Sequence, residues 1–211
     1  MNNSVELSIA EKLLNVEAVK LNPENPFKWA SGWNSPIYCD NRVTLSYPEV
    51  RNQIAENLID VIKKEFSSVD AIAGVATAGI PQASIIADRM GKSLIYVRAK
   101  PKDHGMENLI EGRIEAGQKV VVVEDLISTG GSSLKAVQAL QEQGVEVLGM
   151  VAIFTYGFPI AQQAFDNAGI KLVTLSNYNA LLTVASNKNI LNETQLKSLS
   201  TWRENPSTWN A

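Results

Sequence analysis

Two acidic residues stand side by side at the end of an apolar run, in the stretch KVVVVEDLISTGGSS of residues 119–133. The carboxylates of Glu124 and Asp125 would repel an anion. They can accept hydrogen bonds from neighbouring hydroxyl groups, such as the 2′ and 3′ hydroxyls of a ribose, or lie near a hydrated magnesium ion. These residue types therefore indicate a site for a sugar diol.

A loop of small residues follows the acid pair and precedes an expected helix. The N–H groups and dipole of a helix N-terminus favour an anion, and Gly130 and Gly131 would let the backbone approach a phosphate closely. Ser128, Thr129 and Ser132 add hydroxyl donors. The loop therefore fits a phosphate monoester, and the loop and acid pair together describe a ribose 5-phosphate group. The alternative is that a serine or threonine simply caps the helix.

The elements around this stretch alternate between strand and helix. Short irregular strands are expected in 26–46, and mostly helix is expected in the last 35 residues. Continuous apolar strands that alternate with helices are typical of an α/β fold with a parallel sheet covered on both faces. The periodicity predicts strands at 70–75, 93–98, 119–123, 145–154 and 170–176, and helices at 4–20, 48–66, 80–90, 132–143 and 158–169.

Ligands in such a fold bind beyond the carboxyl ends of the strands. The candidate loops therefore follow Val75, Arg98, Val123 and Phe154. The tripeptide Gly91-Lys92-Ser93 resembles the tail of a P-loop, but it lies between a helix and a strand, which is the reverse of the required order. It is predicted to end a helix.

Length and composition describe an ordinary globular protein. The 211 residues suit one domain, and the net charge of −3 argues against a broad nucleic-acid-binding surface. The single cysteine, Cys39, excludes an internal disulfide and a cysteine-based zinc cluster. The sequence shows neither a secretory signal pattern nor an apolar run long enough to span a membrane, so a cytoplasmic protein without a membrane partner is expected.

Three separated segments resemble one family. VVVVEDLISTGGSS resembles the ribose-phosphate-binding signature of type I phosphoribosyltransferases: four apolar residues, two acids, two variable residues and a Thr/Ser/Gly cluster. FKWASGWNSPIYCDNR, residues 27–42, is similar to the N-terminal substrate segment of orotate phosphoribosyltransferases. RAKPKDHG, residues 98–105, is similar to their mobile catalytic loop. The resemblance extends from about residue 5 to at least residue 180.

The resemblance implies a fold and a reaction. The fold would be a parallel sheet flanked by helices with a small N-terminal hood, in a single domain of residues 1–211. The hood would comprise about 1–47 plus part of the C-terminus, and the core about 48–176. Orotate would attack C1 of 5-phosphoribosyl 1-diphosphate (PRPP), giving orotidine 5′-monophosphate and pyrophosphate for pyrimidine biosynthesis. The family also implies Mg2+ bound mainly through PRPP, with no direct protein ligand, and a homodimer with shared active sites.

The resemblance also assigns residue roles. Arg98, Lys102 and His104 would contact the diphosphate, and Lys102, His104 and Asp125 would act in catalysis. The loop 75–79 would form a second backbone nest, for pyrophosphate. The remaining PRPP-binding residues would be Glu124, Asp125, Leu126, Ile127, Ser128, Thr129, Gly130, Gly131 and Ser132.

The orotate site departs from a well-known subset of the family. Ser128 matches the family's orotate-contacting hydroxyl, and backbone groups near Tyr38 and Cys39 can pair with the edge of the base. The subset carries a lysine where this chain has Ala30, and an arginine after the strand that ends near Phe154, where this chain has Thr155-Tyr156-Gly157. The residue that holds the orotate carboxylate is therefore open.

Lys28 and Arg42 are the candidates for that carboxylate. Lys28 lies two residues before Ala30, and residues two apart share a face of a strand. The alternative for Lys28 is an exposed strand lysine without a ligand. Two other functions compete with orotate transfer: transfer to a purine base, which segment 27–42 disfavours, and a regulator that binds PRPP without catalysis.

Overall fold

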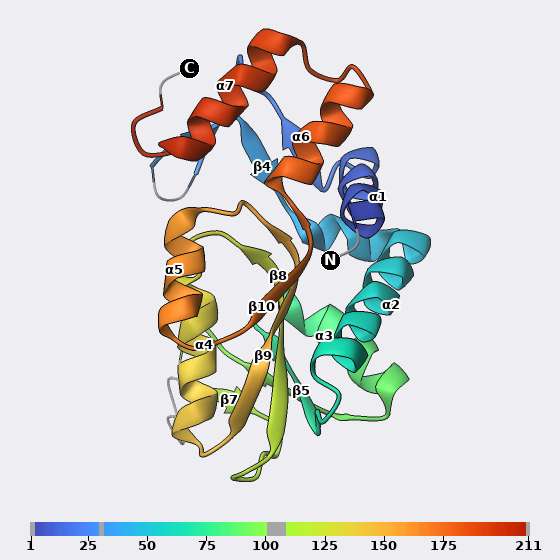
Figure 1. Cartoon of the computed structure of the whole chain (residues 1–211). Coiled ribbons are helices and arrows are strands. Elements are labelled where there is room, and N and C mark those ends of the chain that lie inside the picture. The colour runs from blue at the N-terminus through green and yellow to red at the C-terminus, as the bar shows by residue number, and fades with distance from the viewer. Residues whose placement is uncertain (1–2, 30–31, 101–108, 210–211) are drawn as a thin grey trace.

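A six-stranded sheet forms the centre of the molecule in the computed structural model, which describes residues 3–29, 32–100 and 109–209 (Figure 1). The strand order is β10-β9-β8-β5-β6-β7. The first five of these strands run parallel, and β7 pairs antiparallel with β6 at the edge. The predicted α/β fold with a parallel sheet is therefore confirmed. The strands are β5 (Ala71–Val75), β6 (Ser93–Val97), β7 (Ile110–Glu111), β8 (Lys119–Ile127), β9 (Glu146–Thr155) and β10 (Leu172–Asn177).

Helices cover both faces of this sheet (Figure 1). The valines of β8 show why its sequence is apolar without alternation: Val121 and Val123 pack in one hydrophobic cluster, and Val120 and Val122 pack in the other. A strand buried on both faces needs apolar residues at every position. The helices are α2 (Pro48–Glu65) and α3 (Gly79–Met90) on one face, and α4 (Gly131–Glu142) and α5 (Pro159–Asn167) on the other.

The N-terminal strands and the two C-terminal helices lie together at one end of the sheet (Figure 1). Trp202 is fully buried, and its indole Nε1 donates a hydrogen bond to the main-chain oxygen of Asn34 at 3.2 Å. The rings of Trp29 and Trp202 meet edge to face at 5.5 Å, so the C-terminal helix packs on the N-terminal segment. The elements are α1 (Asn3–Asn15), β1 (Val19–Leu21), β2 (Phe27–Lys28), β3 (Asn34–Ser35), β4 (Ile37–Cys39), the 3-10 helix η1 (Asn41–Ser46), α6 (Tyr178–Asn187) and α7 (Glu193–Glu204).

Two predicted boundaries were wrong by several residues, and one short strand was missed. The first helix ends at Asn15, because the backbone of Glu17 takes a positive φ of 56° and Val19 then pairs with Cys39. Strand β8 continues to Ile127, since the long strand β9 pairs with it as far as Thr155. The two-residue strand β7 was not predicted because so short a strand carries no periodicity.

Gly91 ends helix α3 in the left-handed conformation, with φ 60°, as predicted for the tripeptide that resembles a P-loop tail. Among the described residues, no helix is both long and apolar enough to cross a membrane.

Candidate active site

The acid pair lies inside the last part of β8, beyond the point where its neighbour β5 ends. The pairing of β5 with β8 stops at Val123, whereas β9 continues to pair with β8 from Glu124 to Ile127. At the acid pair, β5 therefore no longer pairs with its edge of β8. Residues of the surrounding loops can approach this edge instead.

Glu124 is almost buried, with 7% of its surface exposed. Its Oε1 accepts a hydrogen bond from the main-chain N–H of Asp125 at 3.0 Å, and its Oε2 accepts one from Ser133 Oγ at 3.1 Å. Burial, together with the neighbouring Asp125, raises the pKa of Glu124 to about 8. Glu124 is therefore mostly protonated at neutral pH, and the pair does not carry two full charges.

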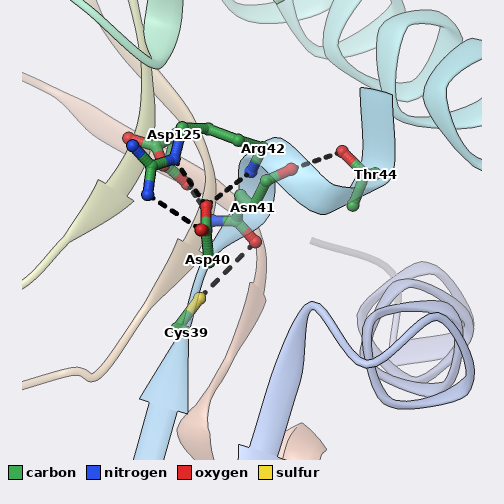
Figure 2. Close-up of polar contacts among 6 residues, drawn as sticks. All are labelled: Cys39, Asp40, Asn41, Arg42, Thr44 and Asp125. Atoms are coloured by element: carbon green, nitrogen blue, oxygen red, sulfur yellow. Dashed lines mark hydrogen bonds and ion pairs between the residues drawn. The ribbon is translucent and has the colours of Figure 1, made fainter. Parts of the chain in front are cut away.

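Asp125 lies closer to the surface than Glu124. Burial raises the pKa of its carboxyl, while hydrogen bonds from neighbouring groups and the positive charge of Arg42 lower it. Asn41 Nδ2 donates a hydrogen bond to the main-chain oxygen of Asp125 at 2.8 Å. Figure 2 shows Asp125 with these residues of the N-terminal segment.

Helix α4 begins at the predicted small-residue loop without a side-chain cap. Its N-cap residue is Gly130, with φ 81° and no side-chain hydrogen bond to the first turn. A Cβ at Gly130 would lie 2.9 Å from the ring of Phe165, so this turn has room only for glycine. The alternative that a serine or threonine caps α4 is wrong, and the N–H groups of the first turn can bind an anion.

Helix α3 presents a second N-terminus to the same region. Its N-cap residue is Ala78, which also makes no side-chain cap, and the preceding Ala76–Thr77 peptide bond is cis. A Cβ at Gly79 would clash with the main-chain oxygen of Val123, so the start of α3 lies directly against β8. The loop 75–79 therefore brings a further set of N–H donors close to the acid pair.

A cavity of about 760 Å3 connects these features. A volume of this size suits a small-molecule ligand. The acid pair, both helix N-termini and Arg98 share this cavity, although they come from three separate parts of the sequence. Its walls comprise Val75, Ala76, Thr77, Ala78, Val97, Arg98, Ala99, Leu109, Glu124, Asp125, Leu126, Gly131, Ser132, Lys135, Ala136, Gln138, Ala139 and Glu142.

Arg98 stands where strand β6 ends. Its guanidinium Nη1 lies 3.6 Å from Glu111 Oε1, and its main-chain N–H bonds to the oxygen of Leu109 at 2.8 Å. These contacts connect Arg98, which precedes the segment that carries Lys102 and His104, with Leu109 and Glu111, which follow it. Both of those predicted residues lie outside the described residues.

The predicted orotate residues are less closely grouped. Tyr38 is 42% exposed and its ring lies 5.6 Å from that of Phe27. Lys28 is exposed on β2. Ser128 lies in the connection between β8 and α4, and Ala30 lies outside the described residues. Neither Tyr38 nor Lys28 is among the described residues that line the 760 Å3 cavity.

Tyr156 is the middle residue of the tripeptide 155–157, which stands where the subset of the family carries arginine. It is 2% exposed, and its ring packs within 6 Å of four other aromatic rings. Burial raises the pKa of its hydroxyl well above the ordinary value, so Tyr156 stays neutral and supplies no charge for a carboxylate. The four partners are Trp29, Phe154, Phe158 and Trp202.

Sequence reasoning missed three residues at this site. Ser133 bonds to Glu124, Asn41 bonds to Asp125, and Lys135 lines the cavity one helical turn after Ser132. The position of Lys135 follows from helical spacing once the start of α4 is known. The contact between Asn41 and Asp125 joins residues 84 positions apart, and no local sequence pattern predicts it.

Comparisons with known proteins agree with this geometry. Residues 45–180 match the family model described as "Phosphoribosyl transferase domain". An orotate phosphoribosyltransferase of Cytophaga hutchinsonii is 63% identical over 209 residues, which cover 99% of each chain. One from Listeria monocytogenes is 54% identical and covers 98% of this chain and 99% of its own.

Solved structures show the same similarity in three dimensions. The orotate phosphoribosyltransferase of Aeropyrum pernix superposes with a TM-score of 0.76 at 29% identity, covering 87% of this chain and 99% of its own. The UMP synthase of Leishmania donovani superposes with a TM-score of 0.79 at 27% identity, covering 94% of this chain and 42% of that longer protein. The type I phosphoribosyltransferase fold is thus confirmed. From its sequence, its fold and the geometry at the end of β8, the chain belongs to the orotate phosphoribosyltransferase family.

Proposed function

We propose that this chain transfers the 5-phosphoribosyl group from PRPP to orotate, giving orotidine 5′-monophosphate and pyrophosphate in pyrimidine biosynthesis. The observation that carries the proposal is the acid pair Glu124–Asp125 between two uncapped helix N-termini in one cavity. This arrangement offers a hydrogen-bond acceptor for a diol and two separate anion sites, which match the ribose diol, the 5-phosphate and the diphosphate of PRPP. The full-length relatives named orotate phosphoribosyltransferase support orotate as the acceptor.

The ribose 5-phosphate part of PRPP would bind at β8 and α4. Free N–H groups at the start of α4 and the hydroxyls of Ser128, Thr129 and Ser132 would bind the 5-phosphate. Asp125 would accept hydrogen bonds from the ribose hydroxyls. The high pKa of Glu124 helps here, because a neutral neighbour lets a polyanionic substrate approach Asp125 with less repulsion. The main chain of Leu126, Ile127, Gly130 and Gly131 would also contact the ribose 5-phosphate part of PRPP.

The diphosphate would lie against the loop 75–79 and Arg98. Negative charge grows on the leaving pyrophosphate as the bond to C1 breaks, so catalysis consists mainly of positioning and of stabilising that charge. Lys102 and His104 are proposed to supply further positive charge and hydrogen bonds. Losing one well-placed donor at such a position costs about 2.7–4 kcal/mol in the barrier.

Mg2+, when bound, would neutralise charge on the diphosphate. Asp125 offers a carboxylate, which is the kind of oxygen ligand that Mg2+ prefers, whereas Glu124 is mostly protonated. Within the described ranges, no group of three or more His, Cys, Asp or Glu side chains is placed to hold a metal ion. We therefore propose that the diphosphate and ribose oxygens of PRPP supply most of the ligands.

Cys39 is not proposed as a nucleophile. Its Sγ donates a hydrogen bond to Asn41 Oδ1 at 3.5 Å, and burial raises the pKa of the thiol well above its ordinary value. A neutral thiol is a weak nucleophile. This agrees with a reaction in which orotate attacks C1 directly.

Orotate would bind between the N-terminal segment and the end of β8. Ser128 would contact the base, and the strand that carries Tyr38 would supply backbone groups for its edge. Lys28 remains the proposed cation for the orotate carboxylate, because Tyr156 is neutral and enclosed by other rings. We further propose a cytoplasmic homodimer in which the segment holding Lys102 and His104 serves the neighbouring active site.

The test is an assay of orotate consumption with PRPP and Mg2+, followed by the loss of orotate's ultraviolet absorbance and the release of pyrophosphate. Uracil, adenine and xanthine serve as parallel acceptors. We expect turnover with orotate alone. Turnover with a purine and not with orotate would contradict the proposal, and PRPP binding without turnover of any base would indicate a regulator.

A further inference from the structure

We infer that Thr155, the last residue of strand β9, is a positioning residue that places Ser128 for the acceptor base. Thr155 would act through the peptide group between Ile127 and Ser128, which its hydroxyl contacts directly. The inference rests on the proposed function, because that function assigns Ser128 to orotate. It gives a role to one residue of the tripeptide 155–157, which stands where the subset of the family carries arginine.

The main-chain oxygen of Ile127 accepts two hydrogen bonds from the end of β9. Thr155 Oγ1 donates to it at 3.2 Å, and the main-chain N–H of Tyr156 donates to it at 3.2 Å. A carbonyl oxygen has two lone pairs, so these two donors use its full capacity. The ring of Tyr156 is buried among other aromatic rings, which fixes the second donor in place. The peptide group that follows Ile127 is therefore held in one orientation against β9.

The hydroxyl of Thr155 is itself oriented by a short turn. The main-chain N–H of Gly157 donates to Thr155 Oγ1 at 3.0 Å. Gly157 has a φ of 66°, a conformation that favours glycine and that turns the chain back toward Thr155. A hydroxyl that accepts this bond still has its own hydrogen to donate. That hydrogen is directed to the oxygen of Ile127.

The orientation of this peptide group decides where the main-chain N–H of Ser128 points. The C=O and N–H groups of a planar trans peptide point in opposite directions. The oxygen of Ile127 points toward β9, so the N–H of Ser128 points toward the other side of β8, where pairing with β5 has stopped at Val123. Among the described residues, this N–H donates to no other group. Ser128 thus presents a donor without a protein partner on the side where the loop after β5 lies.

These contacts show what Thr155 contributes. Without its hydroxyl, the oxygen of Ile127 keeps only the N–H of Tyr156 as a partner, and the peptide group gains freedom to rotate. The side chain of Ser128 would then lie less often in the position that contacts the base. The N–H groups at the start of α4 do not depend on this hydroxyl, so the site for the 5-phosphate should change less. The loss should therefore fall mainly on orotate.

The experiment measures kcat and the KM for each substrate in Thr155→Val and Thr155→Ser. Valine has nearly the shape of threonine but lacks the hydroxyl. In Thr155→Val, KM for orotate should rise about five-fold, the effect of one lost hydrogen bond, and KM for PRPP should rise less than about two-fold. Thr155→Ser keeps the hydroxyl and should restore most of the orotate KM.

A double variant tests whether Thr155 acts through Ser128. If the hydroxyl of Ser128 contacts orotate, Ser128→Ala alone should raise KM for orotate by about five- to ten-fold. Thr155→Val should then add less than about two-fold in the Ser128→Ala background, because the contact that it positions is already absent. Two effects that multiply in the double variant would mean that Thr155 acts by another route, and they would overturn the inference.

Thr201→Val is the matched control. The hydroxyl of Thr201 also donates to a main-chain oxygen, that of Lys197 at 3.1 Å, but at an exposed position of α7. This variant should keep both wild-type KM values. Thr155→Val should fold, because Gly157 is exposed and its N–H can bond to water instead. If it does not fold, Thr155→Ala removes the same hydroxyl and takes its place in every comparison.

An orotate KM equal to that of wild type in Thr155→Val would overturn the inference, and so would an equal rise in both KM values. Wild-type protein that consumes no orotate would instead contradict the proposed function. In that case calorimetric titration with orotate decides the question. Weaker orotate binding by Thr155→Val than by wild type would support the inference, and equal or absent binding would overturn it.

Discussion

Ser133 Oγ lies 3.1 Å from Glu124 Oε2, so helix α4 is bonded to the carboxyl group that ends the buried run of β8. The hydroxyl lowers the pKa of Glu124, but burial outweighs it and the pKa rises to about 8. An unfolded glutamate titrates near 4.5. The folded protein therefore binds this proton more tightly than the unfolded chain does.

This difference predicts how stability depends on pH. A raised carboxyl pKa gives stability that is complete below about pH 4.5 and is lost as the pH rises through about 8. Glu124→Gln keeps a neutral group of the same size, so it should unfold several degrees above wild type at pH 8.5, and the difference should be much smaller at pH 5. Thermal unfolding at both pH values checks this. A variant that is equally destabilised at both would show that Glu124 is ionised in the folded state.

The two glycines at the start of α4 should respond differently to alanine. Gly130 has a φ of 81° and the Phe165 ring beside it, whereas Gly131 has open space around the position of a Cβ. Gly130→Ala should lower the free energy of unfolding by about 1–2 kcal/mol, and Gly131→Ala by less than about 0.5 kcal/mol. Denaturant unfolding measures both.

Gly131→Ala then becomes a probe of the ligand. If the first turn of α4 binds the 5-phosphate closely, the new methyl group should weaken PRPP binding without loss of stability. Calorimetric titration with PRPP and Mg2+ measures this. Unchanged affinity would place the phosphate elsewhere.

Lys102→Ala should slow the reaction with little effect on stability. If its ammonium group stabilises the leaving pyrophosphate, kcat should fall about 100- to 1,000-fold. Lys197→Ala, at an exposed position of α7, is the matched control and should keep wild-type kcat. A fall of less than about three-fold in Lys102→Ala would remove this residue from the catalytic step.

Lys28→Met should raise KM for orotate more than KM for PRPP, because the proposal pairs this lysine with the orotate carboxylate. Steady-state kinetics with each substrate varied in turn gives both values. Lys28 is exposed on a two-residue strand, so the substitution should leave the fold intact. An orotate KM equal to that of wild type would mean that another group holds the carboxylate.

Much of this fold could be predicted because its signals are local. The valines of β8 predict a doubly covered strand, and Pro48 predicts the start of α2, which begins at that residue. The acid pair and the small-residue loop were found because they are adjacent in the sequence. The cap of α4 needed the structure, since serine, threonine and glycine are all common there and only the backbone angle of Gly130 decides between them.

Other parts of the site depend on packing between distant segments. Tyr156 could have been a polar ligand on its sequence alone, and only the surrounding rings show that it is a core residue. Arg42 could equally have faced solvent or orotate, and its orientation follows from Asp40. The contact between Asn41 and Asp125 depends on where η1 packs against β8, which no periodicity encodes.

The hydrogen bond from Trp202 to Asn34 also bears on how the protein is made. During translation the N-terminal segment leaves the ribosome first. Its β2–β3 hairpin can form the contact with Trp202 only after that residue, 168 positions after Asn34, has been synthesised. The sheet of β5 to β9 can form before that point, because its contacts end by Thr155. A nascent chain could thus form β8 and its neighbour strands early and complete its N-terminal hairpin last, so a ribosome stalled before residue 202 would hold a chain without the contact between Trp202 and Asn34.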